Sequence, residues 1–320
     1  MPLSTEPTID AARARAYRIP AERPEADGSL AWDATTLVVA EIDAGPVTGL
    51  GYTYADAGAA QLVAPLLAGA LRGMPACDIP AAVDAMWRAV RNVGRSGIAA
   101  CAISALDIAL WDAKAKLAGA PLAVLLGRAH TRVPVYGSGG FTTYDARTLA
   151  AQLDDWRSQR VRACKIKIGE HDADDMGRLR IARDALGPDV ALFVDANGAY
   201  SPRTALAFAD AAAGFDIRWF EEPVSADDVD GLRFVRERVG PRVDVAAGEY
   251  AYTSDDFRRL LSACAVQRIR HVEWFHDHVR IERMLFDGAP ELVDGGLEID
   301  AARPGLGLAF RRTDAEQFAV

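Results

Sequence analysis

The stretch Lys165-Ile166-Lys167-Ile168 is one of six short apolar runs that alternate with helical segments rich in Ala, Arg and Asp. Strands and helices in regular alternation predict βα units around a parallel sheet. Residues 131–288 are therefore expected to form an α/β domain of the (β/α)8, or TIM-like, barrel type. The other five runs occupy residues 133–136, 192–195, 217–221, 243–247 and 271–275.

Charged residues follow four of these runs at a regular spacing. Lys167 and Asp195 are 28 residues apart, and Asp195 and Glu221 are 26 apart. Glu221 and Glu249 are again 28 apart. One βα unit needs about that many residues, so each side chain is predicted to end its own strand at the same edge of the sheet. In a barrel of this type, that edge carries the active site.

The three acids of this series are expected to meet at one place. Two carboxylates about 5 Å apart repel by roughly 3 kcal/mol at an effective dielectric constant near 20, so the cluster predicts a bound cation. Oxygen ligands without Cys or His favour Mg²⁺ or Mn²⁺ over zinc. The alternative is three unrelated surface acids at loop starts, and their common register favours the metal site. The predicted ligands are Asp195, Glu221 and Glu249.

The two lysines of the first run share one face of the predicted strand, because side chains alternate along a strand. The isoleucines between them would face the surrounding helices. Lys165 and Lys167 are then expected to point into the barrel, where an unpaired ammonium group is costly. They fit only near carboxylates, a metal ion or an anionic substrate. An edge strand with a solvated lysine face is the alternative, and Asp195 one unit further on disfavours it.

The rest of the chain predicts a second structural unit. Strand patterns come first and helical patterns follow, at residues 35–42, 49–54, 58–73, 79–92 and 97–118. The tail after about residue 289 returns to strand and turn signals. We expect an α+β domain from residues 1–130, to which the C-terminal tail of residues 289–320 returns.

The composition excludes several kinds of partner. The chain of 320 residues has 36 Lys and Arg against 45 Asp and Glu, a net charge of -9. This argues against nucleic acid, because phosphate binding needs a basic face. No apolar run reaches the length of a membrane span, and the first residues lack the order of a signal peptide. The four cysteines form no Cys-x-x-Cys pair, which favours a cytoplasmic location.

Several motifs resemble the enolase superfamily, and within it the mandelate racemase / muconate lactonizing enzyme branch. The helical run at 104–116 also resembles that family's capping-domain signature, so the resemblance covers nearly the whole chain. It implies an α+β capping domain on a barrel. The motifs are Lys165-Ile166-Lys167, Asp195-Ala196-Asn197-Gly198, Phe220-Glu221-Glu222-Pro223 and Ala247-Gly248-Glu249.

The resemblance also implies a role for each matching residue. It makes Asp195, Glu221 and Glu249 the Mg²⁺ ligands. It makes Lys167 the base that removes the proton α to a substrate carboxylate, with Lys165 as electrostatic support. A cation stabilises the ene-diolate as its charge develops. Because a neighbouring ammonium disfavours protonation, Lys165 is expected to lower the pKa of Lys167.

Further residues are expected around the substrate. Glu273 matches the acid at the end of the family's eighth strand, which hydrogen-bonds the substrate carboxylate. Asn197 and Ser138 follow strands at the active-site edge and are expected to contact substrate. Tyr54 and residues 17–32 correspond to the two places where the family's capping domain covers the site.

The predicted barrel is too short for the family. Glu249 and Glu273 are separated by 24 residues, which hold one helix and one strand, whereas strands six and seven belong there. The Asp and His that these strands carry in racemases have no counterpart. Either the protein has lost two βα units or its natural chain is longer. We favour the second alternative, because the loss would expose two strand edges, with the join near residues 265–268.

The resemblance implies an enzyme that uses Mg²⁺ to remove an α-proton from a small carboxylate through an enolate intermediate. We expect an acid-sugar dehydratase, which is a hydro-lyase. Racemisation or epimerisation of a 2-hydroxy acid and cycloisomerisation of a muconate-like diacid are alternatives that the missing strands would separate. A catalytically impaired homologue that keeps Mg²⁺ and binds a carboxylate is an alternative of another class. We expect a homo-oligomer with no nucleic-acid or membrane partner.

Overall fold

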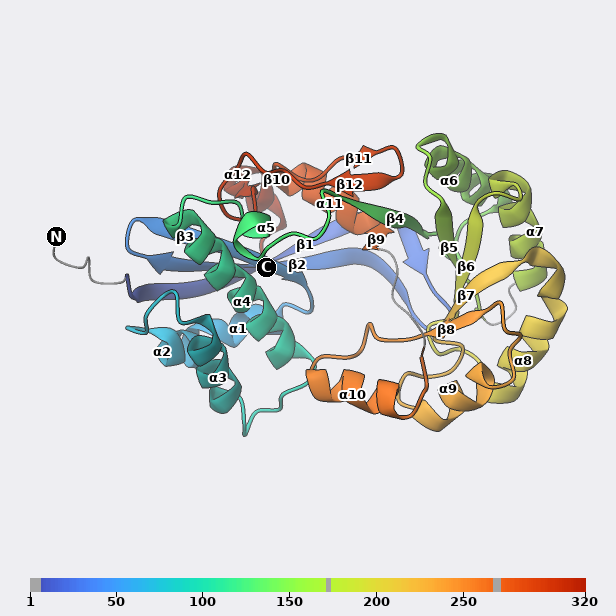
Figure 1. Cartoon of the computed structure of the whole chain (residues 1–320), viewed down its shortest axis with the longest axis horizontal. Helices are drawn as coiled ribbons and strands as arrows, with labels where there is room; N and C mark the ends of the chain where they lie inside the picture. The colour runs from blue at the N-terminus through green and yellow to red at the C-terminus, as the bar shows by residue number, and fades with distance from the viewer. Residues whose placement is uncertain (1–6, 171–173, 267–271) are drawn as a thin grey trace.

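The structure, a computed structural model, describes residues 7–170, 174–266 and 272–320. Two main sheets lie next to each other and are bridged by a long hairpin (Figure 1). The first part of the chain forms β1 (Ile9–Ala26), β2 (Ala31–Ala44), β3 (Val47–Tyr54), α1 (Gly58–Gln61), a π-helical turn (Val63–Leu67), α2 (Ala68–Leu71), α3 (Ile79–Ala89), α4 (Ile98–Leu117) and α5 (Leu122–Leu125).

Alternating strands and helices make up the second part. They are β4 (Arg132–Gly139), α6 (Ala146–Ser158), β5 (Ala163–Lys167), α7 (Asp175–Leu186), β6 (Ala191–Asp195), α8 (Pro202–Ala211), a 3-10 turn (Ala213–Phe215), β7 (Ile217–Glu221), α9 (Val229–Arg236), β8 (Asp244–Ala246), α10 (Ser254–Ser262), β9 (Val272–Phe275) and α11 (His276–Leu285). The tail forms β10 (Phe286–Asp287), β11 (Leu292–Val293), β12 (Gly296–Glu298), β13 (Ala309–Phe310), α12 (Arg312–Ala315) and a 3-10 turn (Glu316–Phe318).

Strands β1, β2 and β3 form an antiparallel sheet that is covered by helix α4. Two glycines of β3 allow the helix to approach the strand backbone closely. A Cβ atom on Gly49 would lie 2.0 Å from the carbonyl oxygen of Ala109, and one on Gly51 would lie 2.0 Å from that of Ala105. Because no side chain fits at either position, the small residues of α4 and β3 together set the spacing of this layer.

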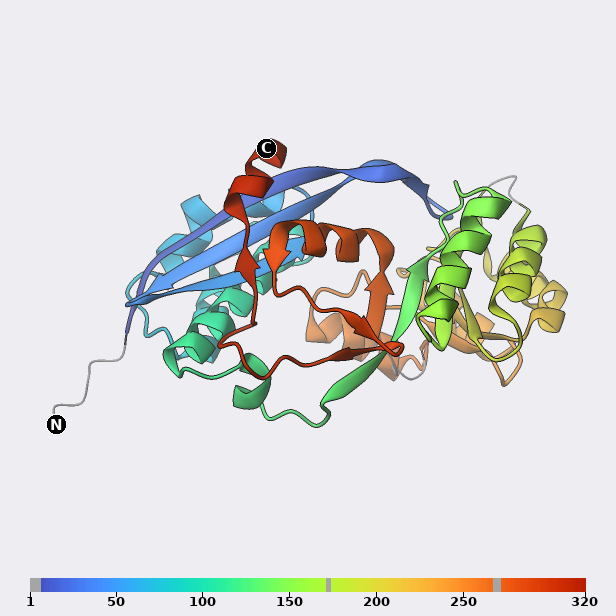
Figure 2. The same cartoon turned by 90° about the horizontal axis from the view of Figure 1, so that it is seen from above.

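Residues 17–32, expected as a loop over the site, form most of a long β-hairpin instead. Strand β1 pairs with β2 up to Pro20, and pairing resumes after an irregular stretch at Glu25 opposite Trp32. Tyr17 lies in the hydrophobic core, with its ring centroid 5.3 Å from that of Phe310. Only the tip at residues 27–30 leaves the strands. Backbone pairing with β2 therefore keeps this range extended and carries it toward the barrel (Figure 2).

The second sheet contains six parallel strands in the order β9-β4-β5-β6-β7-β8. Helices α6 to α9 pack on its outer side around one large apolar core. In the part of the chain that the structure describes, β8 pairs only with β7, and β9 pairs only with β4 among the parallel strands. The result is the predicted barrel without its closing strands. The predicted join lies partly outside the described residues, since 267–271 are not among them.

The C-terminal tail returns to the first sheet. Ala319 bridges to Tyr17, and the C-terminal turn lies beside β1 (Figure 2). Asp112 of α4 holds another part of the tail, since its carboxylate accepts hydrogen bonds of 2.7 Å from the backbone N–H of Leu306 and of 2.7 Å from that of Leu50. The domain boundary at residue 130 stays a prediction.

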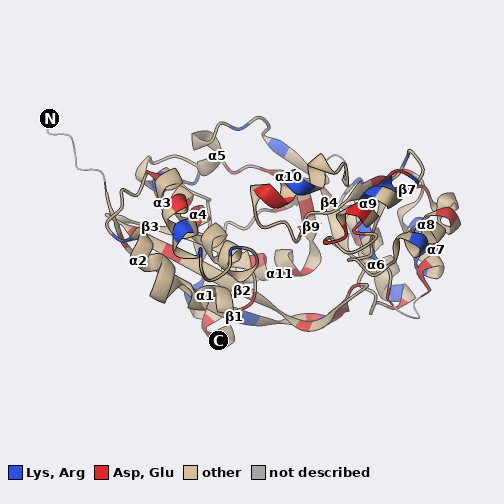
Figure 3. Cartoon of the chain, turned by 90° about the horizontal axis from the view of Figure 1, so that it is seen from below, with Lys and Arg blue, Asp and Glu red and all other residues tan. Residues whose placement is uncertain are grey.

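Charged residues of both signs are interspersed over the described elements (Figure 3). Within the described ranges, none of the helices combines the length and hydropathy needed to cross a bilayer.

Replacement of Asp112 by Ala tests the attachment of the tail. The change leaves two backbone N–H groups without their acceptor and removes the 2.6 Å ion pair to Lys116. We expect the free energy of unfolding to fall by about 3 kcal/mol, measured by urea denaturation. The control is Asp84→Ala, which removes an exposed pair with Arg88 on α3 and should change stability by less than about 0.5 kcal/mol. Equal effects of the two variants would contradict this role of Asp112.

Candidate active site

Parallel pairing brings the predicted side chains to one edge of the barrel sheet. Lys167 lies opposite Asp195 in the register of β5 and β6, and Asp195 lies opposite Glu221 in that of β6 and β7. Glu249 follows β8 at the same edge, beyond the last strand residue Ala246. The regular spacing in the sequence therefore reflects four successive strands whose ends meet.

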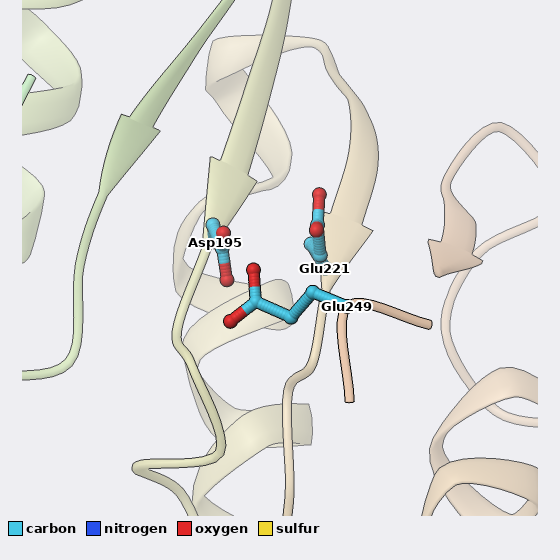
Figure 4. A group of neighbouring side chains, drawn as sticks. All are labelled: Asp195, Glu221 and Glu249. Carbon is cyan, nitrogen blue, oxygen red and sulfur yellow. The ribbon is translucent and has the colours of Figure 1, made fainter. Parts of the chain in front are cut away.

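Asp195, Glu221 and Glu249 come together as a cluster of oxygen ligands (Figure 4). One carboxylate oxygen from each lies within 4.8 Å of those of the other two. Glu249 reaches from the segment after β8 across to Asp195, and it is the exposed member of the cluster. Anionic oxygens at this separation need a compensating cation. A donor set of carboxylate oxygens, without nitrogen or sulfur, fits Mg²⁺.

Lys165 lies at the centre of the carboxylates. Its ammonium nitrogen is 2.9 Å from Glu221 Oε2, 2.9 Å from Glu273 Oε1 and 3.2 Å from Asp195 Oδ2. Only 1% of its side chain is exposed. Burial alone would lower the pKa of Lys165, but the three carboxylates outweigh it and raise the pKa well above its usual value. Lys165 is therefore a fixed positive charge. It points into the barrel, as the alternation of side chains along the strand predicts.

Lys167 is buried beside the three clustered carboxylates. Its ammonium group donates to Asp195 Oδ2 at 2.7 Å and to Asn197 Oδ1 at 2.9 Å. Burial and the charge of Lys165 lower the pKa of Lys167, but Asp195 and Glu249 raise it, and the net direction is upward. The expected lowering by Lys165 is present but is outweighed, because the fold also gathers carboxylates around this amine. A cation held by those carboxylates would offset part of their effect.

Asn197 connects Lys167 to two of the acids. Its backbone N–H donates to Asp195 Oδ1 at 3.0 Å, and its side-chain amide donates to Glu249 Oε1 at 3.0 Å. Its Oδ1 accepts from Lys167. The backbone φ of Asn197 is +44°, in the left-handed region that Asn tolerates better than most residues. Asn197 was expected at the substrate, and its side chain is used here to hold the base and the ligands in place.

Trp219 is a site residue that the sequence analysis missed. Its indole N–H donates to Glu221 Oε2 at 3.0 Å, the same oxygen that accepts from Lys165. These two donors fix one oxygen of Glu221 and leave the other to a cation. Trp219 and Glu221 are two residues apart on one strand, so the sequence already places both side chains on the same face. The sequence does not show whether the indole reaches the carboxylate.

Glu273 completes the charged network on β9. It lies deep in the molecule, yet 38% of its side chain remains accessible because it faces the open side of the barrel. Burial would raise the pKa of Glu273, but Lys165 overrides this and lowers it. Ser138 of β4 lies opposite Lys165 in the β4–β5 register and is fully buried. Its predicted contact with substrate stays a prediction.

The carboxyl groups of the site lie close enough to disfavour one another's ionised forms. Burial and the charges of Glu249, Asp195 and Glu221 raise the pKa of Glu222 to about 8. Burial and neighbouring acids also raise the pKa of Glu221 and the pKa of Glu249. A divalent cation among these groups would favour their ionised forms, which is a second reason why these residues fit Mg²⁺.

Tyr54 at the end of β3 contacts the barrel through α11. Its ring stacks on His278, with ring centroids 3.5 Å apart and an interplanar angle of 6°. Its hydroxyl donates to the backbone carbonyl of His278 at 3.2 Å. Burial lowers the pKa of His278 to about 4, so the imidazole is neutral at physiological pH. The capping sheet therefore meets the barrel just after the strand that carries Glu273.

Comparison with known families agrees with this geometry. Residues 18–127 match the family described as the mandelate racemase / muconate lactonizing enzyme N-terminal domain, and residues 148–270 match the enolase C-terminal domain-like family. A cycloisomerase of 3,6-anhydro-alpha-L-galactonate from Streptomyces coelicolor is 36% identical over 263 residues, which are 80% of this chain and 72% of the relative. The chain belongs to the mandelate racemase / muconate lactonizing enzyme branch of the enolase superfamily.

Other relatives and solved structures support the same family. D-galactarolactone cycloisomerase from Agrobacterium fabrum is 35% identical over 77% of this chain and 66% of its own length. L-talarate/galactarate dehydratase from Salmonella typhimurium is 37% identical over 57% of this chain and 47% of its own length. The chain thus spans from about half to about three quarters of these relatives.

Two solved structures of the superfamily have similar folds. A mandelate racemase/muconate lactonizing enzyme-like protein from Rubrobacter xylanophilus has a TM-score of 0.94 and 41% identity, covering 98% of this chain and 100% of that chain. A racemase from Streptomyces coelicolor with bound magnesium has a TM-score of 0.89 and 28% identity, over the same shares of both chains. Magnesium is thus present in a homologous structure, and this chain has an acidic triad that can bind a metal.

Single amide replacements test the three predicted ligands. Asp195→Asn, Glu221→Gln and Glu249→Gln each remove one anionic oxygen, and each should weaken Mg²⁺ binding at least about 10-fold, measured by titration calorimetry. Asp154→Asn is the control, since Asp154 lies exposed on α6 beside Arg157, and its affinity should match the unmodified protein. Unchanged affinity in all three site variants would remove this cluster as the metal site.

Proposed function

We propose that this protein uses Mg²⁺ to remove the proton α to the carboxylate of a small hydroxy acid, and that its reaction is acid-sugar dehydration. The observation that carries the proposal is the pairing of a buried lysine with a metal-ligand candidate, Lys167 Nζ at 2.7 Å from Asp195 Oδ2. A base next to a cation site can act on a substrate whose carboxylate is held by that cation. Dehydratases among the relatives support the choice.

The residues divide the work of proton abstraction. Asp195, Glu221 and Glu249 would hold the Mg²⁺, which stabilises negative charge on the substrate carboxylate. Lys167 first loses its own proton to solvent and then takes the α-proton on its amine nitrogen. Lys165 stays charged, because three carboxylates surround it, and keeps the ligands in place.

Glu273 is suited to meet the substrate carboxylate from the open side of the barrel. A hydrogen bond between two carboxyl groups needs a proton on one of them. In the unliganded protein Lys165 favours the ionised form of Glu273. The negative charge of an entering substrate acts in the opposite direction and raises the pKa of Glu273. Substrate binding and proton uptake by Glu273 are therefore coupled in this proposal.

Cycloisomerisation is the second candidate, because two relatives at 35% and 36% identity are named as cycloisomerases. Racemisation or epimerisation needs a second base on the far face of the α-carbon. A homologue that binds Mg²⁺ and a carboxylate without turnover is the candidate of another class, favoured by the open side of the barrel between β8 and β9. We further propose a cytoplasmic homo-oligomer that acts on a small carboxylate.

Removal of the Lys167 amine tests the proposed base. Lys167→Ala should reduce exchange of the substrate α-proton with D₂O to the background rate, because no other amine in the described site contacts Asp195 except the permanently charged Lys165. Exchange is followed by proton NMR with a panel of mono- and diacid sugars. Mg²⁺ affinity, measured by calorimetry, serves as the control and should stay within about 10-fold of the unmodified protein. Retained exchange would exclude Lys167 as the base.

The fate of each enantiomer tests the open side of the barrel. Lys167 reaches one face of the α-carbon, and the described residues between Glu249 and Glu273 form helix α10 but no strand that could carry a second base. We expect exchange of the α-proton of one enantiomer only, so a 2-hydroxy acid should not racemise. The measurement is NMR exchange with each pure enantiomer, on protein whose intact mass matches the 320-residue chain. Rapid interconversion of both enantiomers by that material would contradict the prediction.

A further inference from the structure

Arg178 of α7 is a buried cation that binds backbone rather than carboxylates. Only 8% of the residue is exposed. Every hydrogen bond that the structure describes for its guanidinium goes to a main-chain carbonyl oxygen. The acceptors are Lys167 at 3.4 Å, Tyr144 at 3.2 Å, Gly140 at 2.6 Å and Phe141 at 2.9 Å.

Burial of this guanidinium is costly, and it lowers the pKa of Arg178 despite the charges of Asp175 and Glu170 nearby. A buried charge is tolerated when its donors are satisfied. The planar group does this by donating to four carbonyls near the active-site ends of β4 and β5. Two of them, those of Gly140 and Phe141, also accept from backbone N–H groups. Loss of the guanidinium would remove the side-chain donor of the other two, those of Lys167 and Tyr144.

The carbonyls that Arg178 binds include that of the proposed base. The backbone N–H of Lys167 donates to the Gly140 carbonyl oxygen at 3.1 Å, and the Lys167 carbonyl accepts from Arg178. The same Gly140 oxygen accepts from Arg178 at 2.6 Å. Both polar groups of the Lys167 main chain are thus fixed to one point, the end of β4, and Arg178 closes this arrangement.

The segment from Gly140 to Tyr144 is also covered by the tip of the β1–β2 hairpin. The Thr142 N–H donates to the Ala26 carbonyl at 2.9 Å. The Thr143 hydroxyl donates to the Pro24 carbonyl at 2.8 Å. Arg178 therefore binds the inner side of a segment whose outer side carries the hairpin. The segment thus links the hairpin to the carbonyls that Arg178 binds.

We propose that Arg178 is a positioning residue that fixes the main chain of Lys167 and ties it to the segment under the β1–β2 hairpin. The inference rests on the proposed role of Lys167 as the base. Arg178 does not touch the reacting atoms; it determines where the lysine stem starts. A displacement of about 1 Å of a reacting group can cost about 100-fold in rate, so loss of this support should appear in turnover.

Arg183 provides a matched control on the same helix. It is also partly buried and also binds main-chain carbonyls, and burial lowers its pKa as well. Its acceptors lie at the opposite ends of the strands, before β6 and β7. They are Gly187 at 2.8 Å, Val190 at 2.9 Å, Phe215 at 2.9 Å and Asp216 at 3.4 Å. Loss of Arg183 thus removes a similar set of hydrogen bonds to main-chain carbonyls and should lower stability, but at a place far from Lys167.

The experiment compares Arg178→Gln with Arg183→Gln in the full chain with Mg²⁺. For Arg178→Gln we expect kcat for α-proton exchange to fall about 10- to 100-fold, with KM and Mg²⁺ affinity within about 3-fold of the unmodified protein. Hydrogen exchange should lose protection in β5, in residues 140–144 and in residues 24–27. For Arg183→Gln we expect a comparable loss of thermal stability, but unchanged kcat and unchanged protection at these three places.

The milder pair Arg178→Lys and Arg183→Lys keeps the test decisive if a glutamine variant does not fold. A lysine offers its donors from one atom and cannot span four carbonyls, so Arg178→Lys should show the same changes in smaller size. The inference is overturned if the Arg178 variants match their Arg183 counterparts in kcat and in protection. If the unmodified protein exchanges no α-proton of any acid tested, the proposed function fails, and the protection data alone decide whether Arg178 fixes β5.

Discussion

The ammonium group of Lys165, surrounded by carboxylates from three other strands, is the constraint on which the site depends. Lys165 belongs to β5, and it contacts Glu221 two strands away on one side and Glu273 two strands away on the other. In a flat sheet such strands lie about 10 Å apart. The two contacts of 2.9 Å are made on the concave side of a curved sheet, where inward side chains converge. The contacts of Lys165 therefore form only if the sheet is curved, the strands keep their register and the carboxylates are present to balance the charge.

The same requirement explains what the sequence predicted well. The alternation of side chains along the strand predicted that Lys165 and Lys167 point into the barrel. The spacing of the strand ends predicted the three acids. Both arguments use the local geometry of a strand and the length of a βα unit, which the sequence contains directly. The side-chain register then follows, because slipping a strand by one residue would turn its charged side chains into the helical layer.

The features that were wrong or missed depend on contacts between distant parts of the chain. The stacking of Tyr54 on His278 joins residues more than 200 positions apart, and no local sequence pattern predicts it. Residues 17–32 were expected to cover the site because they correspond to a loop of the resembled family, whereas pairing with β2 makes most of them strand. Lys165 lowers the pKa of Lys167 as expected, but the fold adds Asp195 and Glu249, which raise it and outweigh Lys165.

The open side of the barrel divides the site into two halves with different physical character. Asp195 and Glu221 are buried because strands flank them on both sides, whereas Glu249 after β8 and Glu273 on β9 remain accessible beside the opening. The buried half holds the proposed base next to the predicted cation ligands, in a medium where electrostatic interactions are strong. In the proposed function this half removes the α-proton. The second proton transfer or the departure of a leaving group needs donors on the other face of the substrate. The curated relatives are named as cycloisomerases, dehydratases and epimerases. In the proposed function, the step that distinguishes these reactions falls on the side of the substrate where the described residues of this chain include no strand.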